Sequence, residues 1–374
     1  MASKKRCTRR DFLRVGVAGA LASAAGGLRA TSSSGLSAVP RVNGAVNVAP
    51  LRRFERDAGL SLPLIDPALV DLQLREVYEL GFERIRIAIS FNRFGADFFA
   101  AIPYVRAARA LGIHVLGIID QFSGFDLVNA LSRESTREEV LEVYLALFDD
   151  VVAPATSAIP AVGAFSVQVL NEPTHFLGIH PSDYVREFLA PAYLHLKEDD
   201  PNVIVVSAAE VGGADGVLRM RAMFEAGLEE HCDRVAFHVY DERIIPRLSG
   251  MARKPVWITE SGAVGLDRHF DWATRVFDSI RAGIPRVEQV FYFDLFDFDP
   301  NRFRLLDIVR DPDGGFTPVV ESKRLYDYLI ARVDDARDGA AHASYRELIP
   351  DVTDYFPTEA DFRRVQSTSY GRRF

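Results

Sequence analysis

The chain has 374 residues, of which 48% are hydrophobic and 26% are charged, and its formal net charge is −8. This composition is typical of a globular protein and excludes a disordered, collagen-like or disulfide-scaffold chain. The negative charge argues against a nucleic-acid-binding protein, and the length allows either two domains or one large barrel.

The first 30 residues differ chemically from the rest of the chain. They hold seven Lys or Arg and one Asp, so their net charge is +6, against −14 for the remaining residues. A basic stretch up to Arg14 precedes an apolar run from Val15 to Leu28. That run is too short to span a bilayer, since a spanning helix needs about 20 apolar residues. The order is typical of an export signal.

The segment from Thr8 to Leu13, with its Arg9-Arg10 pair, resembles a bacterial twin-arginine signal. The resemblance implies that residues 1–30 direct export of the folded protein through the twin-arginine machinery. The mature protein is then expected in the periplasm or secreted, with no membrane association. The sequence leaves the cleavage site open, and an uncleaved basic tail is the alternative. A Ser- and Gly-rich linker follows at residues 31–43.

From residue 44 onward, short apolar or β-branched runs alternate with helical patterns. Eight of these runs predict strands, and several are apolar on both faces, as in a buried parallel sheet. The predicted strands are Ala45–Val48, Arg84–Phe91, His114–Ile119, Phe165–Leu170, Val203–Ser207, Val235–Tyr240, Val256–Thr259 and Val290–Leu295.

Helical patterns fill most of the connections between these runs. The pattern after strand one places Val70 and Val77 on one face, with Pro67 in its first turn and Gly81 at its end. The connection after strand six, from Glu242 to Gly250, is short and has no clear helical pattern. Further helices are predicted at Asp97–Leu111, Arg137–Val151, Ser182–Lys197, Ala214–Leu228, His269–Arg281 and Glu321–Val333.

Alternation of strands and helices predicts an α/β fold with a parallel sheet and right-handed crossovers. Eight such units over residues 44–333 match the (β/α)8 TIM barrel. The alternative is an open doubly wound sheet, which usually carries a Gly-rich phosphate turn after its first strand. Here strand one runs into Asn47-Val48-Ala49-Pro50, with no such turn. Residues 334–374 are charged, with scattered aromatics, and predict a tail that wraps the barrel or is partly loose.

Two of the predicted strands end in a Glu. Strand four ends at Asn171-Glu172, and strand seven ends at Glu260. In such barrels the chemistry occupies the C-terminal ends of the strands, so we expect the two carboxyls to converge. A converging pair suits acid and nucleophile chemistry on a glycosidic bond, provided that one carboxyl stays protonated and the other ionised.

Polar side chains on neighbouring strands supply that asymmetry. Arg86 lies within an apolar strand and must point into a polar cavity, because a buried unpaired guanidinium is costly. Near Glu260 it lowers the pKa of that carboxyl. His238 and Tyr240 alternate to the same face of strand six, and we expect Tyr240 to hydrogen-bond Glu260. Asn171 is expected to hold a sugar hydroxyl.

This set of residues resembles the clan of retaining (β/α)8 glycoside hydrolases that includes the cellulase-like families. The clan has Asn-Glu-Pro after strand four, Glu after strand seven, Arg in strand two and His-x-Tyr in strand six, and all four occur here on the corresponding strands. The resemblance implies retaining hydrolysis of a β-linked poly- or oligosaccharide, with Glu172 as acid/base and Glu260 as nucleophile. The lining residues that it implies are Arg86, Asn171, His238 and Tyr240.

Strand eight departs from the clan's pattern. Many members place a Trp at its end as a floor for the sugar, whereas this chain reads Phe291-Tyr292-Phe293-Asp294. Tyr292 or Phe293 is expected to take that role, so the identity of the sugar, endo or exo action, and hydrolysis or transfer stay open. Trp257 is predicted to face the helices.

Two other functions are kept as alternatives, a metal-dependent TIM-barrel hydrolase and a carbohydrate-binding barrel without turnover. Metal-ligand residue types near strand ends are His114, His175, His238, Asp120 and Asp294. Strand one lacks a His-x-His, however, and a pure binding module is expected to lose one carboxylate. No cofactor motif is present, so neither cofactor nor metal is expected. Glu210, after strand five, suits substrate contact or helix capping equally. The oligomeric state stays open.

Overall fold

The predicted strands form one parallel sheet in the computed structural model of the chain. The structure describes residues 44–47, 53–54, 63–64, 67–88, 96–119, 141, 145, 164–210, 213–263, 266–293, 295, 305–313, 315–336, 343–360 and 363. The export signal at residues 1–30 and the linker at residues 31–43 lie outside these residues, so both stay predictions.

Eight strands make up the sheet, one for each predicted run. They are β1 (Gly44–Asn47), β4 (Phe82–Ala88), β5 (His114–Ile119), β6 (Phe165–Val169), β7 (Ile204–Val206), β8 (Val235–His238), β9 (Val256–Ser261) and β10 (Val287–Tyr292). Their order is β7-β6-β5-β4-β1-β10-β9-β8, and every pair is parallel. A parallel bridge between Val206 and Arg234 joins the edge strands. The sheet therefore closes, and the fold is the predicted (β/α)8 TIM barrel.

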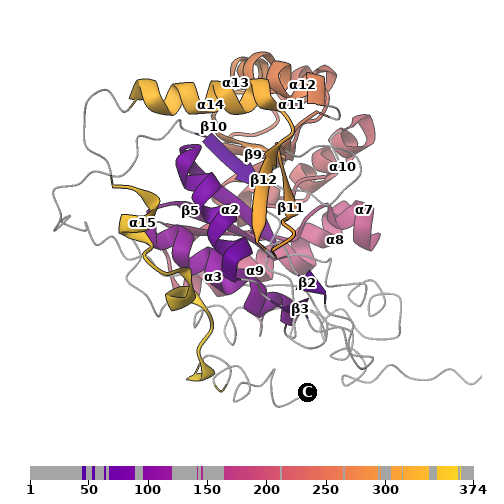
Figure 1. Cartoon of the computed structure of the whole chain (residues 1–374). Coiled ribbons are helices and arrows are strands. Elements are labelled where there is room, and N and C mark those ends of the chain that lie inside the picture. Colours follow the sequence, from indigo (N-terminus) through magenta and orange to yellow (C-terminus); the bar gives the residue numbers. More distant parts are fainter. Residues whose placement is uncertain are drawn as a thin grey trace, which may run out of the picture.

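Helices surround this sheet, as Figure 1 shows. Those of the first half are α2 (Pro67–Glu79), α3 (Ala96–Ala110), α7 (Pro173–Leu177), α8 (Pro181–Asp183), η3 (Tyr184–Leu189) and α9 (Ala190–Asp199). Those of the second half are α10 (Ala214–Glu225), η4 (Leu228–His231), η5 (Glu242–Ile244), α11 (Ile245–Leu248), α12 (Leu266–Asp271), η6 (Trp272–Val276), α13 (Phe277–Gly283) and α14 (Lys323–Ala336). The predicted helix Arg137–Val151 lies outside the described residues except for Leu141 and Leu145, which are helical and pack against the core.

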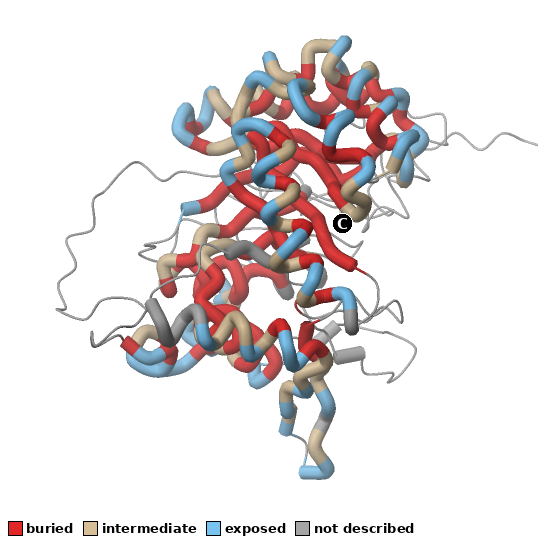
Figure 2. The backbone as a smooth tube through the Cα atoms, turned by 90° about the horizontal axis from the view of Figure 1, so that it is seen from above, coloured by how far each residue is buried: buried red, intermediate tan, exposed pale blue. Residues whose placement is uncertain are grey.

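Strand alternation divides the buried residues into two layers. In β4, Ile85 and Ile87 join the large cluster between strands and helices, while Arg86 between them faces the barrel interior. The interior cluster itself consists of Leu116, Val206, Ala209, Ala236, Trp257 and Phe291. Figure 2 shows the strands buried at the centre and the outer sides of the helices exposed.

The prediction for Trp257 was wrong, because this residue faces the barrel interior rather than the helices. Its ring lies 5.6 Å from that of His114 and 5.9 Å from that of Phe291, centroid to centroid. The cause is an irregularity in β9: Phe237 pairs with Ile258, yet the next residue, His238, pairs with Glu260. An extra residue in one strand reverses the alternation beyond it. Trp257 and Glu260 therefore share a face although their spacing is odd.

Two hairpins were not predicted. β2 (Arg53–Phe54) pairs with β3 (Pro63–Leu64), and β11 (Leu306–Arg310) pairs with β12 (Phe316–Val320), both antiparallel. After α14 the chain adds α15 (Tyr345–Leu348) and η7 (Val352–Tyr355), which contact α2 and α3. Among the described residues, no helix combines the length and apolar character needed to cross a membrane.

Candidate active site

Arg86 organises the site from the middle of the barrel. It is 2% exposed, so its charge must be paired. Its Nε donates to Gln168 Oε1 at 2.8 Å, its Nη1 to Glu260 Oε1 at 2.7 Å, and its Nη2 to Asn171 Oδ1 at 2.8 Å. One guanidinium thus fixes side chains from β6, from the loop after it, and from β9.

Glu172 follows β6 in a tight turn. Its backbone is left-handed, with φ 45° and ψ 51°, and Pro173 then starts α7. Pro suits this first helical position because its missing N–H is not needed there. The side chain is buried and meets His238 of β8, with 2.7 Å between Glu172 Oε1 and His238 Nδ1. A proton lies along this contact, on either atom according to the tautomer of His238.

Glu260 occupies a different environment, rich in donors. Its Oε1 accepts from Arg86, and its Oε2 accepts from the Tyr240 hydroxyl at 2.7 Å. Burial by itself raises the pKa of this carboxyl. Electrostatic interactions with His238 and Arg86, and the hydrogen bonds from Tyr240 and Arg86, outweigh burial and hold the pKa below its usual value. Glu260 is therefore ionised at neutral pH.

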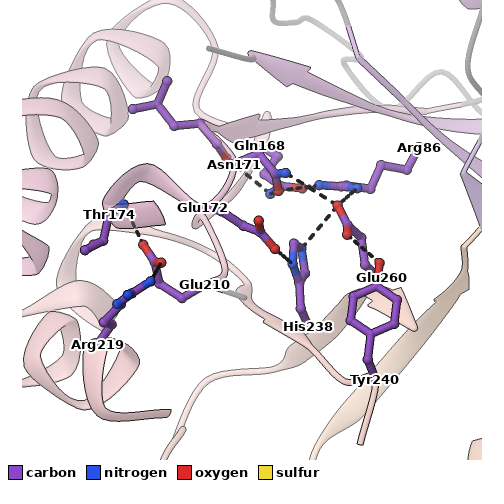
Figure 3. Close-up of polar contacts among 11 residues, drawn as sticks. Arg86, Gln168, Asn171, Glu172, Thr174, Glu210, Arg219, His238, Tyr240 and Glu260 are labelled. Carbon is purple, nitrogen blue, oxygen red and sulfur yellow. Dashed lines mark hydrogen bonds and ion pairs between the residues drawn. The ribbon is translucent and has the colours of Figure 1, made fainter. Parts of the chain in front are cut away.

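The two carboxyls meet at the mouth of the barrel, as the sequence predicted. Carboxylate oxygens of Glu172 and Glu260 lie within 4.8 Å of one another, with His238 beside both. Figure 3 shows His238 reaching Glu172 on one side and Glu260 on the other. Tyr240 carries a packing role as well, with its ring centroid 6.2 Å from that of Phe293.

Of the expected site residues, the structure brings together Arg86, Asn171, Glu172, His238, Tyr240, Glu260 and Phe293. Tyr292 is the exception. Its ring packs edge-on against His269 of α12 and belongs to the cluster between strands and helices. Because neighbouring residues of a strand face opposite sides, Phe293 and not Tyr292 lies next to the site. Asp120 and Asp294 are outside the described residues.

Gln168 and Glu210 are site residues that sequence reasoning missed or left open. Gln168 holds Arg86, and the signal was a polar residue at an inward position of a mostly apolar strand. Glu210 is buried, and its Oε1 accepts from the Thr174 backbone N–H at 2.8 Å. Burial raises the pKa of Glu210, while the Thr174 amide and Arg219 oppose that rise. Of its two predicted roles, this contact matches helix capping.

The metal alternative has one candidate site among the described residues, formed by Glu172, His238 and Glu260. The guanidinium of Arg86 touches Glu260 there, and its positive charge disfavours a divalent cation on the same carboxylate. The two other histidines named above lie elsewhere. His114 contacts Ser166 inside the barrel, and the ring of His175 packs edge-on against Phe176.

Comparison with known proteins supports the fold. No protein-family model and no curated protein matches the chain. The catalytic domain of GH30 xylanase C from Talaromyces cellulolyticus matches 79% of this chain and 77% of its own, with 13% identity and a TM-score of 0.50. A family 51 alpha-L-arabinofuranosidase from Bifidobacterium longum matches at 10% identity over 80% of this chain and 73% of its own, with a TM-score of 0.49.

A Bacteroides uniformis beta-glucuronidase is a further match, at 14% identity and a TM-score of 0.44. The alignment covers 79% of this chain but 35% of that protein, so the chain spans about a third of its length. At 13% identity, the likeness to the xylanase domain shows the (β/α)8 fold alone, and the activity must be argued from the site.

Proposed function

We propose that the chain is a retaining glycoside hydrolase that cleaves a β-linked poly- or oligosaccharide. The observation that carries the proposal is the pair of buried carboxyls, Glu172 and Glu260, with oxygens within 4.8 Å of one another. A retaining enzyme needs its carboxyls roughly 5–5.5 Å apart, whereas an inverting enzyme needs roughly 6.5–9.5 Å to admit a water. The short separation favours the retaining route.

The first step uses the different surroundings of the two carboxyls. Glu260, held ionised by Arg86 and Tyr240, attacks the anomeric carbon and forms a glycosyl ester. Glu172 gives a proton to the leaving oxygen as its bond to the anomeric carbon breaks. The hydrogen bond between Glu172 Oε1 and His238 Nδ1 fixes the carboxyl in position for that transfer.

The second step reverses the roles. A water enters beside Glu172, which takes one of its protons while the water oxygen attacks the anomeric carbon. The ester bond to Glu260 breaks, the carboxylate is regenerated, and Glu172 is again protonated. Glu172 donates a proton in the first step and accepts one in the second, so the site returns to its starting state after each cycle.

The β-linkage rests on the motif resemblance alone, and the assignment of roles rests on that resemblance together with the site contacts. Asn171, fixed by Arg86, lies beside Glu260 to hold a sugar hydroxyl. Phe293 against Tyr240 is the aromatic wall in place of the missing Trp. Export through the twin-arginine route remains part of the proposal, because residues 1–30 lie outside the described residues.

Two glutamine variants test the proposal. Reducing-sugar release is first screened across β-glucans, mannans, xylans and bacterial exopolysaccharides, and aryl glycosides of the active sugar are then used. Glu260→Gln is expected to abolish turnover of every substrate, because no nucleophile remains. Glu172→Gln is expected to cost about 10²–10⁴-fold on poor leaving groups and far less on an activated aryl glycoside. Glu225→Gln, an exposed carboxyl on α10, is the matched control.

Turnover by Glu260→Gln at the wild-type rate would refute the nucleophile assignment. An equal loss of turnover by Glu172→Gln on good and poor leaving groups would refute the assignment of Glu172 as the general acid. Loss of wild-type activity in a chelator points instead to the metal alternative, and tight sugar binding with no product released points to a binding module.

A further inference from the structure

The turn that carries Glu172 is held in an unfavourable backbone conformation. Leu170 has φ 61° and Glu172 has φ 45°, and neither is a glycine. Residues with a Cβ pay a free-energy cost in the left-handed region, and the surrounding structure must over-determine such a conformation for it to persist. The question is therefore which contacts hold this turn.

The contacts come from the segment that follows β7 and runs beside the turn. The Glu172 N–H donates to the Ala209 carbonyl at 3.0 Å. The Thr174 N–H donates to Glu210 Oε1 at 2.8 Å. Just before the turn, the buried Tyr184 hydroxyl donates to the Val169 carbonyl at 2.9 Å. The Glu172 and Thr174 contacts thus attach the turn to the segment after β7.

Glu210 is the ionisable member of this set. Its side chain is fully buried, and Arg219 Nη1 of α10 lies 3.5 Å from its Oε2. A carboxylate that accepts a backbone N–H forms a charge-assisted bond, stronger than a bond between neutral groups. Figure 3 places Glu210 and Arg219 on the opposite side of Glu172 from His238 and Glu260.

We propose that Glu210 is a positioning residue for Glu172. Anchored by Arg219, it holds the Thr174 amide, and with it the first turn of α7 and the left-handed backbone that aims Glu172 toward the sugar. The inference rests on the proposed function and adds a residue to its machinery. Glu210 makes no hydrogen bond to Glu260, Arg86 or Tyr240, so its main effect is expected on proton transfer by Glu172 rather than on attack by Glu260.

The chain offers a matched control at another part of the barrel. Glu229 of η4 also accepts two backbone N–H groups, from Arg253 at 2.6 Å and Lys254 at 2.8 Å, in the loop that leads into β9. Removing that carboxylate breaks the same kind of bond without touching the turn of Glu172. Glu229→Leu is therefore the matched control for Glu210→Leu.

The test compares Glu210→Leu, which removes the acceptor, with Glu210→Gln, which keeps one. For Glu210→Leu we expect kcat/KM on a glycoside with a poor leaving group to fall about ten- to hundredfold. On an activated aryl glycoside the fall is expected to stay within about threefold, since that leaving group needs little acid help. Glu210→Gln is expected to restore most of the loss, and Glu229→Leu to affect both substrates equally.

A double-variant cycle separates positioning from general damage. With Glu172→Gln already in place, Glu210→Leu is expected to cost nothing more, because the group that it positions is gone. If the two losses multiply instead, or if Glu210→Leu hurts both substrates alike, the inference is wrong. Should Glu210→Leu not fold, Arg219→Met carries the test, with the same leaving-group selectivity expected at about threefold and its absence overturning the inference.

The two proposals fail in different ways. If Glu172→Gln shows no leaving-group dependence, the assignment of Glu172 as the general acid is wrong, and the proposed function fails with it. If Glu172→Gln behaves as expected and the Glu210 variants do not, only the positioning role is lost.

Discussion

At the scale of single residues, the site separates two carboxyls by the donors around them. Glu260 is as buried as Glu172, and burial by itself opposes the ionisation of Glu260. Only Glu260 faces the guanidinium of Arg86 and the hydroxyl of Tyr240. Hydrogen bonds to a charged group are worth more than those to a neutral one, so these donors outweigh the desolvation of Glu260. The different roles proposed for the two carboxyls therefore follow from the donors that lie next to each of them.

Tyr240→Phe tests this balance through the pH dependence of kcat/KM. The variant removes a hydrogen bond that favours the charged form, so the pKa of Glu260 must rise. Because attack needs ionised Glu260, activity is present above that pKa and lost as pH falls through it. We therefore expect the acidic limb of the profile to move to higher pH. Tyr292→Phe, on the far face of the strand, is expected to leave the limb in place; an unmoved limb in Tyr240→Phe would contradict the electrostatic account.

At the scale of elements, three of the turns that precede strands contain a residue with a left-handed backbone conformation. Gly81 (φ 72°) and Gly112 (φ 74°) take left-handed conformations just before β4 and β5. Arg286 (φ 62°) takes the same conformation just before β10, although it carries a Cβ. Its carbonyl accepts from the Val256 N–H, so the turn cannot relax without breaking a sheet contact. The protein therefore stores strain at this turn.

Arg286→Gly is expected to stabilise the protein. The left-handed cost of a residue with a Cβ is about 1–2 kcal/mol, and the extra chain entropy of Gly offsets roughly 0.5–1 kcal/mol of that. The free energy of unfolding should rise by about 0.5–1 kcal/mol, measured by denaturant titration. Arg286→Ala removes the same side chain but keeps Cβ and should give no gain. Equal gains in both variants would assign the effect to the side chain instead.

At the scale of the whole molecule, the segment after α14 is part of the barrel's core. Tyr345 of α15 and Ile349 are fully buried, and the Tyr78 hydroxyl of α2 donates to the Ala343 carbonyl at 2.8 Å. Arg346 pairs with Asp71 of α2 as well. Of the two forms predicted for the tail, residues 343–356 take the one that wraps the barrel.

Ile349→Ala tests whether this segment unfolds together with the barrel. Removing a buried Ile side chain costs about 2–5 kcal/mol when the surrounding core cannot collapse. We expect a loss in this range and a single transition seen alike by fluorescence and by activity. Leu348→Ala, half-buried on the same turn, should cost less. A separate early transition that leaves activity intact would show that the segment folds independently.

The sequence by itself determined the eight strands, the order of strands and helices, and the strand ends that carry Glu172 and Glu260. These features depend on the spacing of apolar residues within short segments, so they can be predicted without knowing the contacts between distant segments. Arg86 was predicted to point inward for the same reason, since a charge in an apolar strand has one tolerable direction.

Only the tertiary structure decided the contacts between distant segments. The irregularity in β9 turned Trp257 inward, and ring contacts with Tyr240 and His269 placed Phe293 rather than Tyr292 at the site. The bond from Thr174 to Glu210 likewise joins two strand ends that share no sequence pattern. Register and pairing arise when the barrel closes, because each strand then meets partners that lie far away along the chain. Short-range periodicity carries no information about them.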